Sequence, residues 1–416
     1  MKTNLTQWLN WQSSLHHSKI ELGLNRVRTV AERLNLLTPN FPIVIVAGTN
    51  GKGSSVTLLD AMLTANNMRV GRYTSPHLLH YNERICIAGT EASDTQICQA
   101  FTTIEAVRAE ISLTFFEFAT LAAMVLFQQN KVDIAILEVG LGGRLDAVNI
   151  FDADVALITT IDIDHSDWLG DNREAIGFEK AGILRAKKPA VCSDPNPPQS
   201  IIQHAKQLAT ELYCIQSDFT YQKTKDGWTW QTDNNSIIDL PKPNLRGDFQ
   251  LQNAAGVLMV LKLLQLPIIP NGLTNAYIPG RFQILSGAVT HILDVAHNPI
   301  GAKVLSTTLQ QYPSKGKTYI ILGMLEKKDI ASFINIMQDS STDWHIAPLN
   351  TPNTATTQRL TDNLLITDNN NIITYSSITK AYNNVLSIAK DGDRILITGS
   401  FYTVAEVLSA IKWESK

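Results

Sequence analysis

The chain has 416 residues, of which 44% are hydrophobic and 18% are charged, and its formal net charge is −3. This length allows two or three domains with buried cores, and the composition is ordinary for a globular protein. The small negative charge gives no electrostatic reason to expect binding to nucleic acid or to an anionic membrane.

Residues 1–18 are polar and lack the cationic start and apolar core of a secretory signal. The most apolar segments, 113–127 and 254–269, each carry a charge and are short for a membrane span, so we expect buried helices. The cysteines have no C-x-x-C spacing and are expected to be reduced thiols: Cys86, Cys98, Cys192 and Cys214. These features predict a cytoplasmic protein.

Residues 4–17 predict a short helix, and an amphipathic helix is expected after Gly23. The apolar run Ile43–Ala47 then predicts a buried strand. A helical pattern extends from Ser55 to about Met68. The turn between them reads Gly48-Thr49-Asn50-Gly51-Lys52-Gly53-Ser54.

Strand, glycine-rich turn and helix form the context of a phosphate-binding loop. Glycines let backbone N–H groups approach phosphate oxygens, and the helix N-terminus adds partial positive charge. We expect Lys52 to reach the terminal phosphates and the Ser54 hydroxyl to hold Mg²⁺. The match to G-x-x-x-x-G-K-[ST] is imperfect, because Gly53 separates the lysine from the hydroxyl. A plain glycine-rich turn is the alternative.

The next 120 or so residues alternate between strand and helix patterns, which predicts a parallel sheet with helices on both faces. Expected strands are 70–73, 85–88, 133–139 and 153–161, and expected helices are 93–110, 114–129 and 172–184. Prolines and turns over 189–245 predict a small β appendage, and a helix follows over 251–264.

A Pro-Gly turn within Tyr277–Phe282 is the best domain boundary. Beyond it, alternation restarts and predicts a smaller Rossmann-like α/β domain. Its expected strands are 291–296, 318–324, 343–349, 372–376 and 394–399. We therefore expect a P-loop ATPase domain over 1–278, a linker over 279–283 and the second domain over 284–416.

Ligands of α/β sheets bind at the carboxyl ends of strands, where Glu138 and His165 lie. Glu138 offers the carboxylate that Mg²⁺ prefers, although it could instead cap the next turn. His165 follows Asp162 and Asp164, so metal binding and a structural role are both open. The remaining histidines, apart from one before Asn298, are expected at the surface or in structural roles: His16, His17, His77, His80, His204, His291 and His345. His77 is a partial exception, because its loop could close on a substrate.

Three further side chains are ambiguous from the residues alone. Lys180 follows Glu179 on a short predicted helix, where a solvated lysine is the simplest interpretation. Arg281 could bind a phosphate or form a surface ion pair. Asp294 ends a predicted strand and could bind ribose hydroxyls, whereas Asn298 before Pro299 could be a helix cap.

The chain resembles the Mur-ligase-like ATP-dependent amide ligases, and within them the bacterial bifunctional dihydrofolate synthase/folylpolyglutamate synthases. The resemblance covers the chain from one end to the other, and the combination of GTNGKGS with SPHL, LEVGLGGRLDA and DVAHNP is specific to the folate branch. The segments that carry it are Gly48–Ser54, Thr74–Leu78, Leu113–Phe118, Leu137–Ala147, Asp164-His165, Glu179–Ile183, Pro279–Gln283, Asp294–Pro299 and Gly399–Val404. Ser166 and Tyr402 depart from the usual residues, and neither has an expected direct role.

The resemblance implies roles for individual residues. Thr49, Asn50, Gly51, Lys52, Gly53 and Ser54 would bind ATP phosphates, with Asn253, Arg281 and Asp294 as further nucleotide contacts. Ser54, Ser75, Glu138, His165 and Lys180 would surround two Mg²⁺ sites, with Lys180 carbamylated. Glu21, Leu22, Gly23, Leu24, Thr114, Phe115, Phe116, Glu117, Leu145, Asp146 and Ala147 would line a pterin-side pocket.

The implied reaction is ATP-dependent addition of L-glutamate to 7,8-dihydropteroate and of further glutamates to reduced folates, through an acyl phosphate. Lys52, Lys180, His165 and Arg281 would carry the catalysis, and the second domain would close over ATP. The resemblance also implies a monomer. A folylpolyglutamate synthase without the first activity, a peptidoglycan-type ligase and a nucleotide-dependent switch are the alternatives.

Overall fold

The computed structural model describes residues 2–18, 20–233, 235–340, 343–366 and 371–413. The chain forms two compact units. Unit 1 comprises Met1–Asn244 with Gln250–Tyr277, and unit 2 comprises Leu245–Phe249 with Ile278–Lys416. Each unit is an α/β fold around a mostly parallel sheet, which confirms the predicted fold class. Segment Leu245–Phe249 differs from the expected division, because it lies with the second unit.

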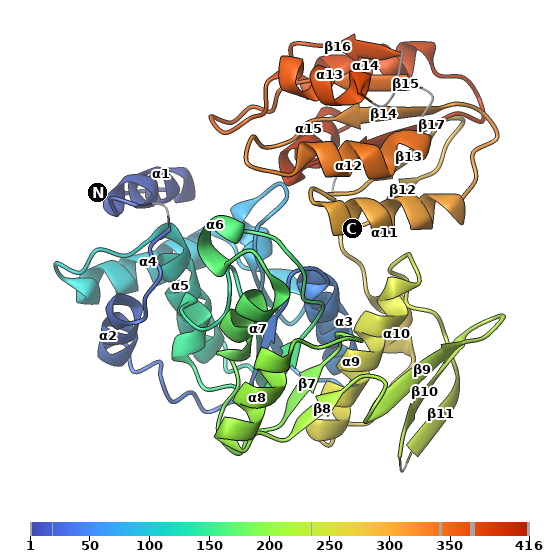
Figure 1. Ribbon diagram of the computed structural model, residues 1–416. Coiled ribbons are helices and arrows are strands. Elements are labelled where there is room, and N and C mark those ends of the chain that lie inside the picture. Colours follow the sequence, from blue (N-terminus) through green and yellow to red (C-terminus); the bar gives the residue numbers. More distant parts are fainter. Residues whose placement is uncertain (1, 19, 234, 341–342, 367–370, 414–416) are drawn as a thin grey trace. The chain divides into compact units, whose positions relative to one another are not determined.

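An eight-stranded sheet lies at the centre of unit 1 in the order β4-β3-β2-β5-β1-β6-β7-β8 (Figure 1). The neighbours from β2 to β8 are parallel, and β3 and β4 are antiparallel additions at one edge. The bounds are β1 (Ile43–Ala47), β2 (Val70–Tyr73), β3 (Ile85–Ile87), β4 (Thr90–Glu91), β5 (Ile134–Glu138), β6 (Val155–Ile158), β7 (Ala190–Cys192) and β8 (Leu212–Cys214).

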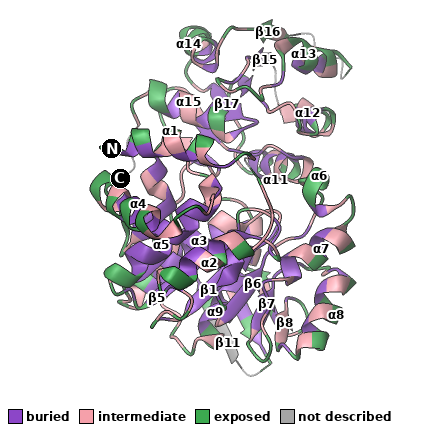
Figure 2. Ribbon diagram, turned by 90° about the vertical axis from the view of Figure 1, so that its left-hand side faces the viewer, coloured by how far each residue is buried: buried purple, intermediate pink, exposed green. Residues whose placement is uncertain are grey.

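Strands β1, β5 and β6 are buried along their whole length (Figure 2). Both faces of these strands are covered, which explains why they read as continuous apolar runs rather than as alternating patterns. Because the three strands are parallel neighbours, their carboxyl ends lie at one edge of the sheet. The loops after Ala47, Glu138 and Ile158 therefore meet there, and these loops carry most of the predicted site.

Helix α3 (Lys52–Ala65) begins three residues earlier than the predicted start at Ser55. Its N-cap is Gly51, whose φ of 86° is a left-handed conformation that glycine adopts readily. The turn therefore enters the helix without a further connecting residue, and Lys52 occupies the first helical position.

The other helices of unit 1 follow the predicted pattern closely. The segments expected as buried helices are α5 and α9, and residues 117–127 and most of 250–261 are buried. The bounds are α1 (Leu5–Leu15), α2 (Asn25–Arg33), α4 (Asp94–Arg108), α5 (Phe115–Gln129), α6 (Ser166–Leu169), α7 (Arg173–Ala181), α8 (Gln199–Leu208), α9 (Phe249–Leu263) and α10 (Asn271–Asn275), with 3₁₀ turns at Tyr81–Arg84 and Ala147–Ile150.

An aromatic cluster holds the N-terminal helix against α4 and α5. The Trp8 ring centroid lies 5.7 Å from that of Phe101 and 6.5 Å from that of Phe118. Phe101 and Phe118 meet edge to face at 5.3 Å, an arrangement that aromatic quadrupoles favour. The cluster anchors α1, which leads into residues 16–24.

The predicted β appendage over 189–245 is wrong in its first half. Residues 190–214 form β7, α8 and β8, which continue the parallel sheet. The prolines that suggested a break precede α8, and Pro198 is its N-cap, where a missing N–H costs no helical hydrogen bond. Only β9 (Phe219–Lys223), β10 (Trp228–Thr232) and β11 (Asn235–Leu240) form a separate antiparallel sheet.

Unit 2 contains a six-stranded sheet in the order β12-β13-β17-β14-β15-β16. The five predicted strands are present, whereas β12, antiparallel to β13 at the edge, was not predicted. The bounds are β12 (Gln283–Leu285), β13 (Thr290–Leu293), β14 (Thr318–Leu322), β15 (Asp343–Ile346), β16 (Ile372–Thr374), β17 (Arg394–Thr398), α11 (Pro299–Gln310), α12 (Ile330–Met337), α13 (Thr357–Leu365), α14 (Ile378–Ile388) and α15 (Phe401–Ala410), with a 3₁₀ turn at Gln338–Ser340.

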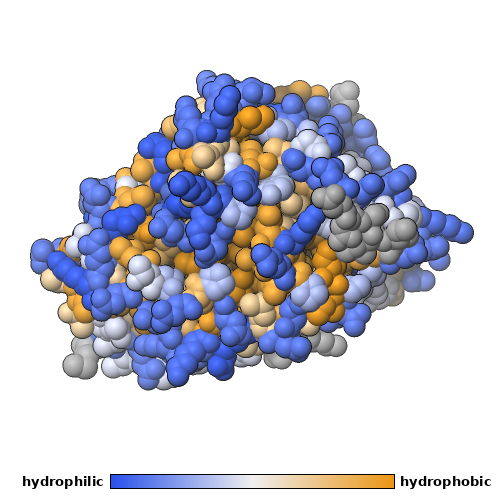
Figure 3. Space-filling model, turned by 90° about the horizontal axis from the view of Figure 1, so that it is seen from below, coloured by the Kyte–Doolittle hydropathy of each residue, from blue (hydrophilic) through white to orange (hydrophobic). Residues whose placement is uncertain are grey.

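The described helices include none that is both long and apolar enough to cross a bilayer. Figure 3 shows one face of the molecule, on which hydrophilic residues predominate and hydrophobic residues lie between them. The described part of the chain therefore contains no candidate membrane-spanning helix.

Candidate active site

The glycine-rich turn after β1 brings two lysines to one carbonyl oxygen. Nζ of Lys52 donates to Gly48 O at 2.9 Å and to Thr49 O at 3.3 Å. Nζ of Lys180, from α7, donates to the same Gly48 O at 3.0 Å. Lys52 and Lys180, which are 128 positions apart in the sequence, thus lie side by side at the turn.

Threonines at the end of β6 fix the shape of this turn. The hydroxyls of Thr159 and Thr160 donate to Asn50 O at 2.7 and 3.1 Å, and Thr49 Oγ1 donates to Asp162 O at 2.9 Å. The two β6 threonines were not among the predicted site residues. Their position directly after an apolar strand, next to the predicted site at Asp162–His165, is the signal that could have identified them.

The start of α3 retains unsatisfied hydrogen-bonding groups. Its N-cap, Gly51, has no side chain to cap the first N–H groups, which are the groups an anion would accept bonds from. Within the described residues, Asn50 Nδ2 and Ser55 Oγ are buried without a hydrogen-bond partner. Uncapped amides, an unpartnered amide side chain and Lys52 fit the phosphates of a nucleotide.

Helix α9 reaches the same turn from 200 residues further along the chain. Asn253 Nδ2 donates to Gln250 Oε1 at 2.9 Å, and Gln250 Nε2 donates to Ser54 Oγ at 3.3 Å. Asn253 and Gln250 are both buried. The structure thus joins the predicted residues Asn253 and Ser54 through Gln250, which the sequence did not single out.

We expect Gly51→Ala to destabilise the protein by about 2–3 kcal/mol, because alanine is strained in the left-handed region. A Cβ at this position would also lie 2.6 Å from Asn253 Oδ1. Urea unfolding measures the stability, and the dependence of the turnover rate on ATP concentration reports damage to the loop.

Gly89→Ala is the matched control for this substitution. Gly89 has a φ of +76°, and nothing lies within 4 Å of the position its Cβ would take. Gly89→Ala should therefore destabilise the protein only through the strain of alanine in a left-handed backbone conformation, by about 1 kcal/mol. Equal destabilisation by the two substitutions would contradict the contact between Gly51 and Asn253.

Lys180 is buried, which overturns the interpretation of a solvated lysine. Burial, together with the nearby charge of Lys52, lowers the pKa of its amine to about 7. Asp164 and Asp146 act in the opposite direction. At neutral pH a large fraction of Lys180 is therefore the neutral amine, which is the nucleophilic form.

Asp146 is a second buried group whose pKa is shifted from its ordinary value. Its carboxylate accepts hydrogen bonds from Leu141 N at 2.8 Å and Val148 N at 3.1 Å. Burial nevertheless raises its pKa to about 7, against the effect of these hydrogen bonds and of Lys52. Lys180 and Asp146, which both titrate near neutral pH, are thus both influenced by the charge of Lys52. Groups with shifted pKa values that lie close together are common in catalytic sites.

Glu138, at the end of β5, contacts the loop that follows β2. Its Oε2 accepts a hydrogen bond from Ser75 N at 3.1 Å, and its side chain is buried. The structure thereby brings together two residues of the predicted metal set. A buried carboxylate beside a loop of backbone and hydroxyl oxygens is a donor set that suits Mg²⁺.

The loop after Ser75 is held by the Glu83-Arg84 pair. The Glu83 carboxylate accepts from the amides of Leu78, Leu79 and His80, each at 2.6 Å. Arg84 Nε donates to His77 Nδ1 at 2.8 Å. Burial, together with Arg84, lowers the pKa of His77 to about 4, so His77 is neutral at physiological pH.

His165 is the N-cap residue of α6 and is exposed. Its φ of 53° lies in the left-handed region, and its Nε2 is 4.0 Å from Asp164 Oδ1. The imidazole of His165 is therefore exposed to solvent in the loop after β6, whereas the side chain of Asp164 is largely buried.

The predicted pterin-side segments meet through an arginine. Arg26 forms an ion pair with Glu21 and another with Glu117 Oε1 at 3.1 Å. Glu117 Oε2 accepts from Thr114 N at 2.7 Å in a capping box at the start of α5. Arg26 thus connects residues 21–24 with residues 114–117, and the sequence-based set did not include it.

The other predicted residues of this region are buried or half-buried. Phe116 packs against Gly140, where a Cβ would lie 2.6 Å from its ring, and Phe115 meets Tyr81 edge to face at 5.7 Å. Ala147 is buried in the 3₁₀ turn after Asp146. Leu22, Gly23, Leu24 and Leu145 are half-buried.

Two predicted nucleotide residues belong to unit 2. The Asp294 carboxylate accepts hydrogen bonds from Phe282 N at 2.7 Å and Ala296 N at 2.8 Å, and burial raises its pKa despite Arg281. The Arg281 guanidinium lies 5.0 Å from the Phe401 ring centroid. Asn298 is the N-cap of α11, accepting from Gly301 N at 2.8 Å, which confirms the helix-cap alternative.

Comparison with known proteins places these features in one family. The Mur ligase middle domain model matches residues 46–261, and the model of the glutamate ligase domain of Mur ligases matches residues 280–401. The chain is 41% identical to the dihydrofolate synthase/folylpolyglutamate synthase of Escherichia coli K12 over 411 residues. The match covers 98% of this chain and 95% of that protein.

Comparison with solved structures identifies the same family. A structure described as E. coli FolC in complex with DHPP and ADP matches with a TM-score of 0.94 and 40% identity, covering 99% of this chain and 98% of that one. A bifunctional folylpolyglutamate synthase/dihydrofolate synthase with Mn, AMPPNP and L-glutamate bound matches at 0.92 and 44%, with the same coverage. The chain therefore belongs to the dihydrofolate synthase/folylpolyglutamate synthase family of Mur ligases.

Proposed function

We propose that this chain is an ATP-dependent ligase that joins L-glutamate to 7,8-dihydropteroate and adds further glutamates to reduced folates. The observation that carries the proposal is the full-length match to bifunctional synthases, supported by the glycine-rich turn that leads into the uncapped start of α3. The alternative of a folylpolyglutamate synthase alone is decided by the assay below.

ATP is needed because a carboxylate does not react with an amine at neutral pH. Its leaving group would be oxide. Transfer of the γ-phosphoryl group to the substrate carboxylate gives an acyl phosphate, in which phosphate is the leaving group. The glutamate α-amine then attacks the acyl carbon, and phosphate departs from the tetrahedral intermediate. Catalysis of such transfers is mostly positioning and charge neutralisation.

Residues 49–54 supply the phosphate contacts in this proposal. The uncapped amides of α3 and the Lys52 ammonium face the developing negative charge, and Asn50 Nδ2 gains the partner it lacks within the described residues. Asn253, which lies against Gly51, adds a nucleotide contact from α9. Arg281, in the proposed linker 279–283, and Asp294, in the proposed second domain 284–416, are proposed as further nucleotide contacts, and the proposed first domain spans 1–278.

Mg²⁺ is expected at two sites built from Ser54, Ser75, Glu138, His165 and Lys180. When bound, the ions neutralise phosphate charge and orient the oxygens of the transferred group. The chain contributes a buried carboxylate at Glu138 and a hydroxyl at Ser54, held in place by Ser75 N and Gln250 respectively.

Lys180 is proposed to act as a carbamate. Its neutral amine can add to CO₂, forming an N–C bond and releasing one proton, and the product is an anionic oxygen ligand. A buried amine with a pKa of about 7 suits this reaction at neutral pH. The change from cation to anion also removes the repulsion between Lys180 and Lys52 at Gly48 O.

The pterin-side pocket is assigned to three segments, Glu21–Leu24, Thr114–Glu117 and Leu145–Ala147. Arg26 supports this assignment, because it ties the first segment to the second. Asp146, with a pKa of about 7, can exchange a proton with a bound substrate near neutral pH. We further propose a cytoplasmic monomer that acts on small molecules and binds no nucleic acid.

Phosphate release from ATP–Mg²⁺ with glutamate tests the proposal. One reaction contains 7,8-dihydropteroate and another contains a reduced folate. We expect release in both, with products heavier by glutamyl units in mass spectrometry. Release with the reduced folate alone would leave a folylpolyglutamate synthase and remove the pterin-pocket assignment. Release in neither would overturn the ligase proposal.

A further inference from the structure

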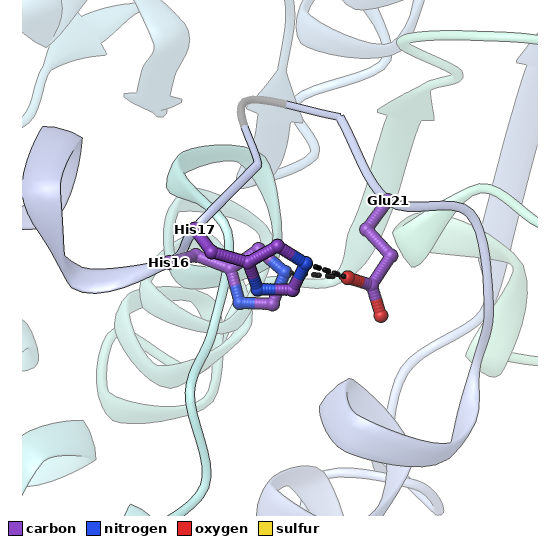
Figure 4. Close-up of side chains that lie close together, drawn as sticks. All are labelled: His16, His17 and Glu21. Atoms are coloured by element: carbon purple, nitrogen blue, oxygen red, sulfur yellow. Dashed lines mark hydrogen bonds and ion pairs between the residues drawn. The ribbon is translucent and has the colours of Figure 1, made fainter.

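We propose that His16, His17 and Glu21 form a binding site for a divalent transition-metal ion of the Zn²⁺ type, separate from the Mg²⁺ sites of the ligase reaction. The three residues join the end of α1 to the segment before α2. Figure 4 shows both imidazole rings directed at the carboxylate of Glu21. Glu21 is also assigned to the pterin-side pocket, but metal binding is measured without substrate, so the proposal does not depend on the ligase activity.

The ligand atoms already converge. Nε2 of His16 lies 2.9 Å and Nε2 of His17 lies 3.1 Å from Oε2 of Glu21. All three ligand atoms lie within 4.8 Å of one another. Tetrahedral Zn²⁺ holds such ligands at about 2.0–2.1 Å, so neighbouring ligand atoms are roughly 3.3 Å apart. Small side-chain rotations are therefore enough to admit the ion.

One of the two hydrogen-bond arrangements of Ser112 leaves room for a cation between His16 and Glu21. Ser112 Oγ lies 3.1 Å from Leu15 O and 2.7 Å from Nδ1 of His16, and when it donates its proton to Leu15 O it accepts a hydrogen bond from His16 Nδ1. With its proton on Nδ1, a neutral His16 presents the Nε2 lone pair to a carboxylate oxygen. Two acceptors at 2.9 Å repel each other unless a positive charge lies between them.

A metal ion and a proton are the two ways to supply that charge. The protonated arrangement places an imidazolium beside His17, whose ring centroid is 4.4 Å away, with Arg26 already paired to the same Glu21 carboxylate. One divalent ion satisfies both imidazoles and Glu21 Oε2 together. The ion thus engages all three ligand atoms, whereas one proton joins only one imidazole to Glu21.

The surroundings support each ligand. The Ser112 hydroxyl orients the His16 ring, and Arg26 holds the other oxygen of Glu21, as supporting groups do around zinc ligands. The His16 side chain is 4% exposed and that of His17 is 78% exposed, so the ion has access from solvent. Two imidazoles and one carboxylate suit Zn²⁺, whereas Mg²⁺ and Ca²⁺ prefer oxygen ligands.

The test is a metal titration of untagged, chelator-stripped protein without nucleotide. Wild type, His17→Ala and the control His204→Ala are titrated with Zn²⁺ by calorimetry and with Co²⁺ by visible absorption. Four-coordinate Co²⁺ absorbs more strongly than six-coordinate Co²⁺ and so identifies the site. His204 lies on α8 and is the matched histidine control.

Wild type and His204→Ala are expected to bind one more equivalent of Zn²⁺ than His17→Ala, with a strong Co²⁺ spectrum that His17→Ala lacks. The affinity should fall as the pH is lowered from about 8 to about 6, because protons compete for the imidazoles. Mg²⁺ should not displace the ion. His16→Asn should lose the same equivalent, and circular dichroism checks that each variant is folded.

Equal Zn²⁺ stoichiometry in wild type and folded His17→Ala would overturn the proposal. The ligase assay is a separate readout, so failure of the metal site and failure of the proposed function are distinguishable.

Discussion

Lys52→Met is expected to lower the rate of glutamate addition by about 100- to 1000-fold, the typical loss when one preorganised charge-stabilising donor is removed. Lys52 Nζ lies at the start of α3, where the proposed phosphates bind, and it is held by Gly48 O and Thr49 O. Methionine keeps the apolar stem of lysine and removes the charge. Phosphate release under saturating ATP and glutamate measures the effect.

The control for Lys52→Met is Lys206→Met, on the exposed face of α8. It removes the same charge away from the site and should retain wild-type turnover. Thermal unfolding of both variants checks that they are folded. If Lys52→Met kept near-normal turnover, the turn at residues 48–54 would not be the phosphate-binding loop of this enzyme.

Lys180→Ala is expected to abolish turnover while ATP still binds. The substitution removes the amine that carries the proposed carbamate and leaves a cavity beside Gly48 O. A short carboxylic acid such as acetate can enter that cavity and should restore part of the activity. Lys180→Met fills the same space without an amine, so it should be inactive and should not respond to acetate.

The pH dependence provides a second test of Lys180. The folded-state pKa of about 7 lies below the ordinary value of 10.5, so the neutral amine is lost as the pH falls through about 7. Carbamate formation should therefore decline below neutral pH. A carbamate signal from ¹³C-labelled bicarbonate should appear in the wild type near neutral pH and be absent from Lys180→Ala. Near-normal turnover in Lys180→Ala would contradict the carbamate role.

The same shift affects stability. The unfolded chain keeps a proton on Lys180 up to about pH 10.5, whereas the folded chain releases it near 7. Between these values the unfolded state binds more protons, so the contribution of Lys180 to folding becomes more favourable as the pH rises. Comparing the pH dependence of unfolding in the wild type and Lys180→Met would isolate this contribution.

Features of the site that are built from neighbouring residues could be predicted from the sequence alone. The turn Gly48–Ser54, its preceding strand and the strand-end Glu138 were all recognised from neighbouring residues. The start of α3 and the extent of the β appendage were misjudged. In both cases a turn residue, Gly51 or Pro198, was taken as a break although it serves as the first cap of a helix.

Contacts between segments far apart in the chain could not be predicted in the same way. Gln250 reaches Ser54, and Arg26 reaches Glu117, only after α9 and α2 have packed. The residues alone predicted a solvated Lys180, because a lysine beside a glutamate on a short helix is usually exposed, and only the family resemblance assigned it to the metal site. Its burial depends on how α7 lies against the turn after β1, which no local pattern encodes.

The sequence by itself determined the fold class, the glycine-rich turn at residues 48–54 and the types of side chain available for chemistry, since strand periodicity and glycine turns are properties of short segments. The tertiary structure decided which of those side chains are desolvated and which share a partner. Burial and distance set the pKa of Lys180 and Asp146 and brought His16, His17 and Glu21 together. These quantities depend on the packing of elements far apart in the chain.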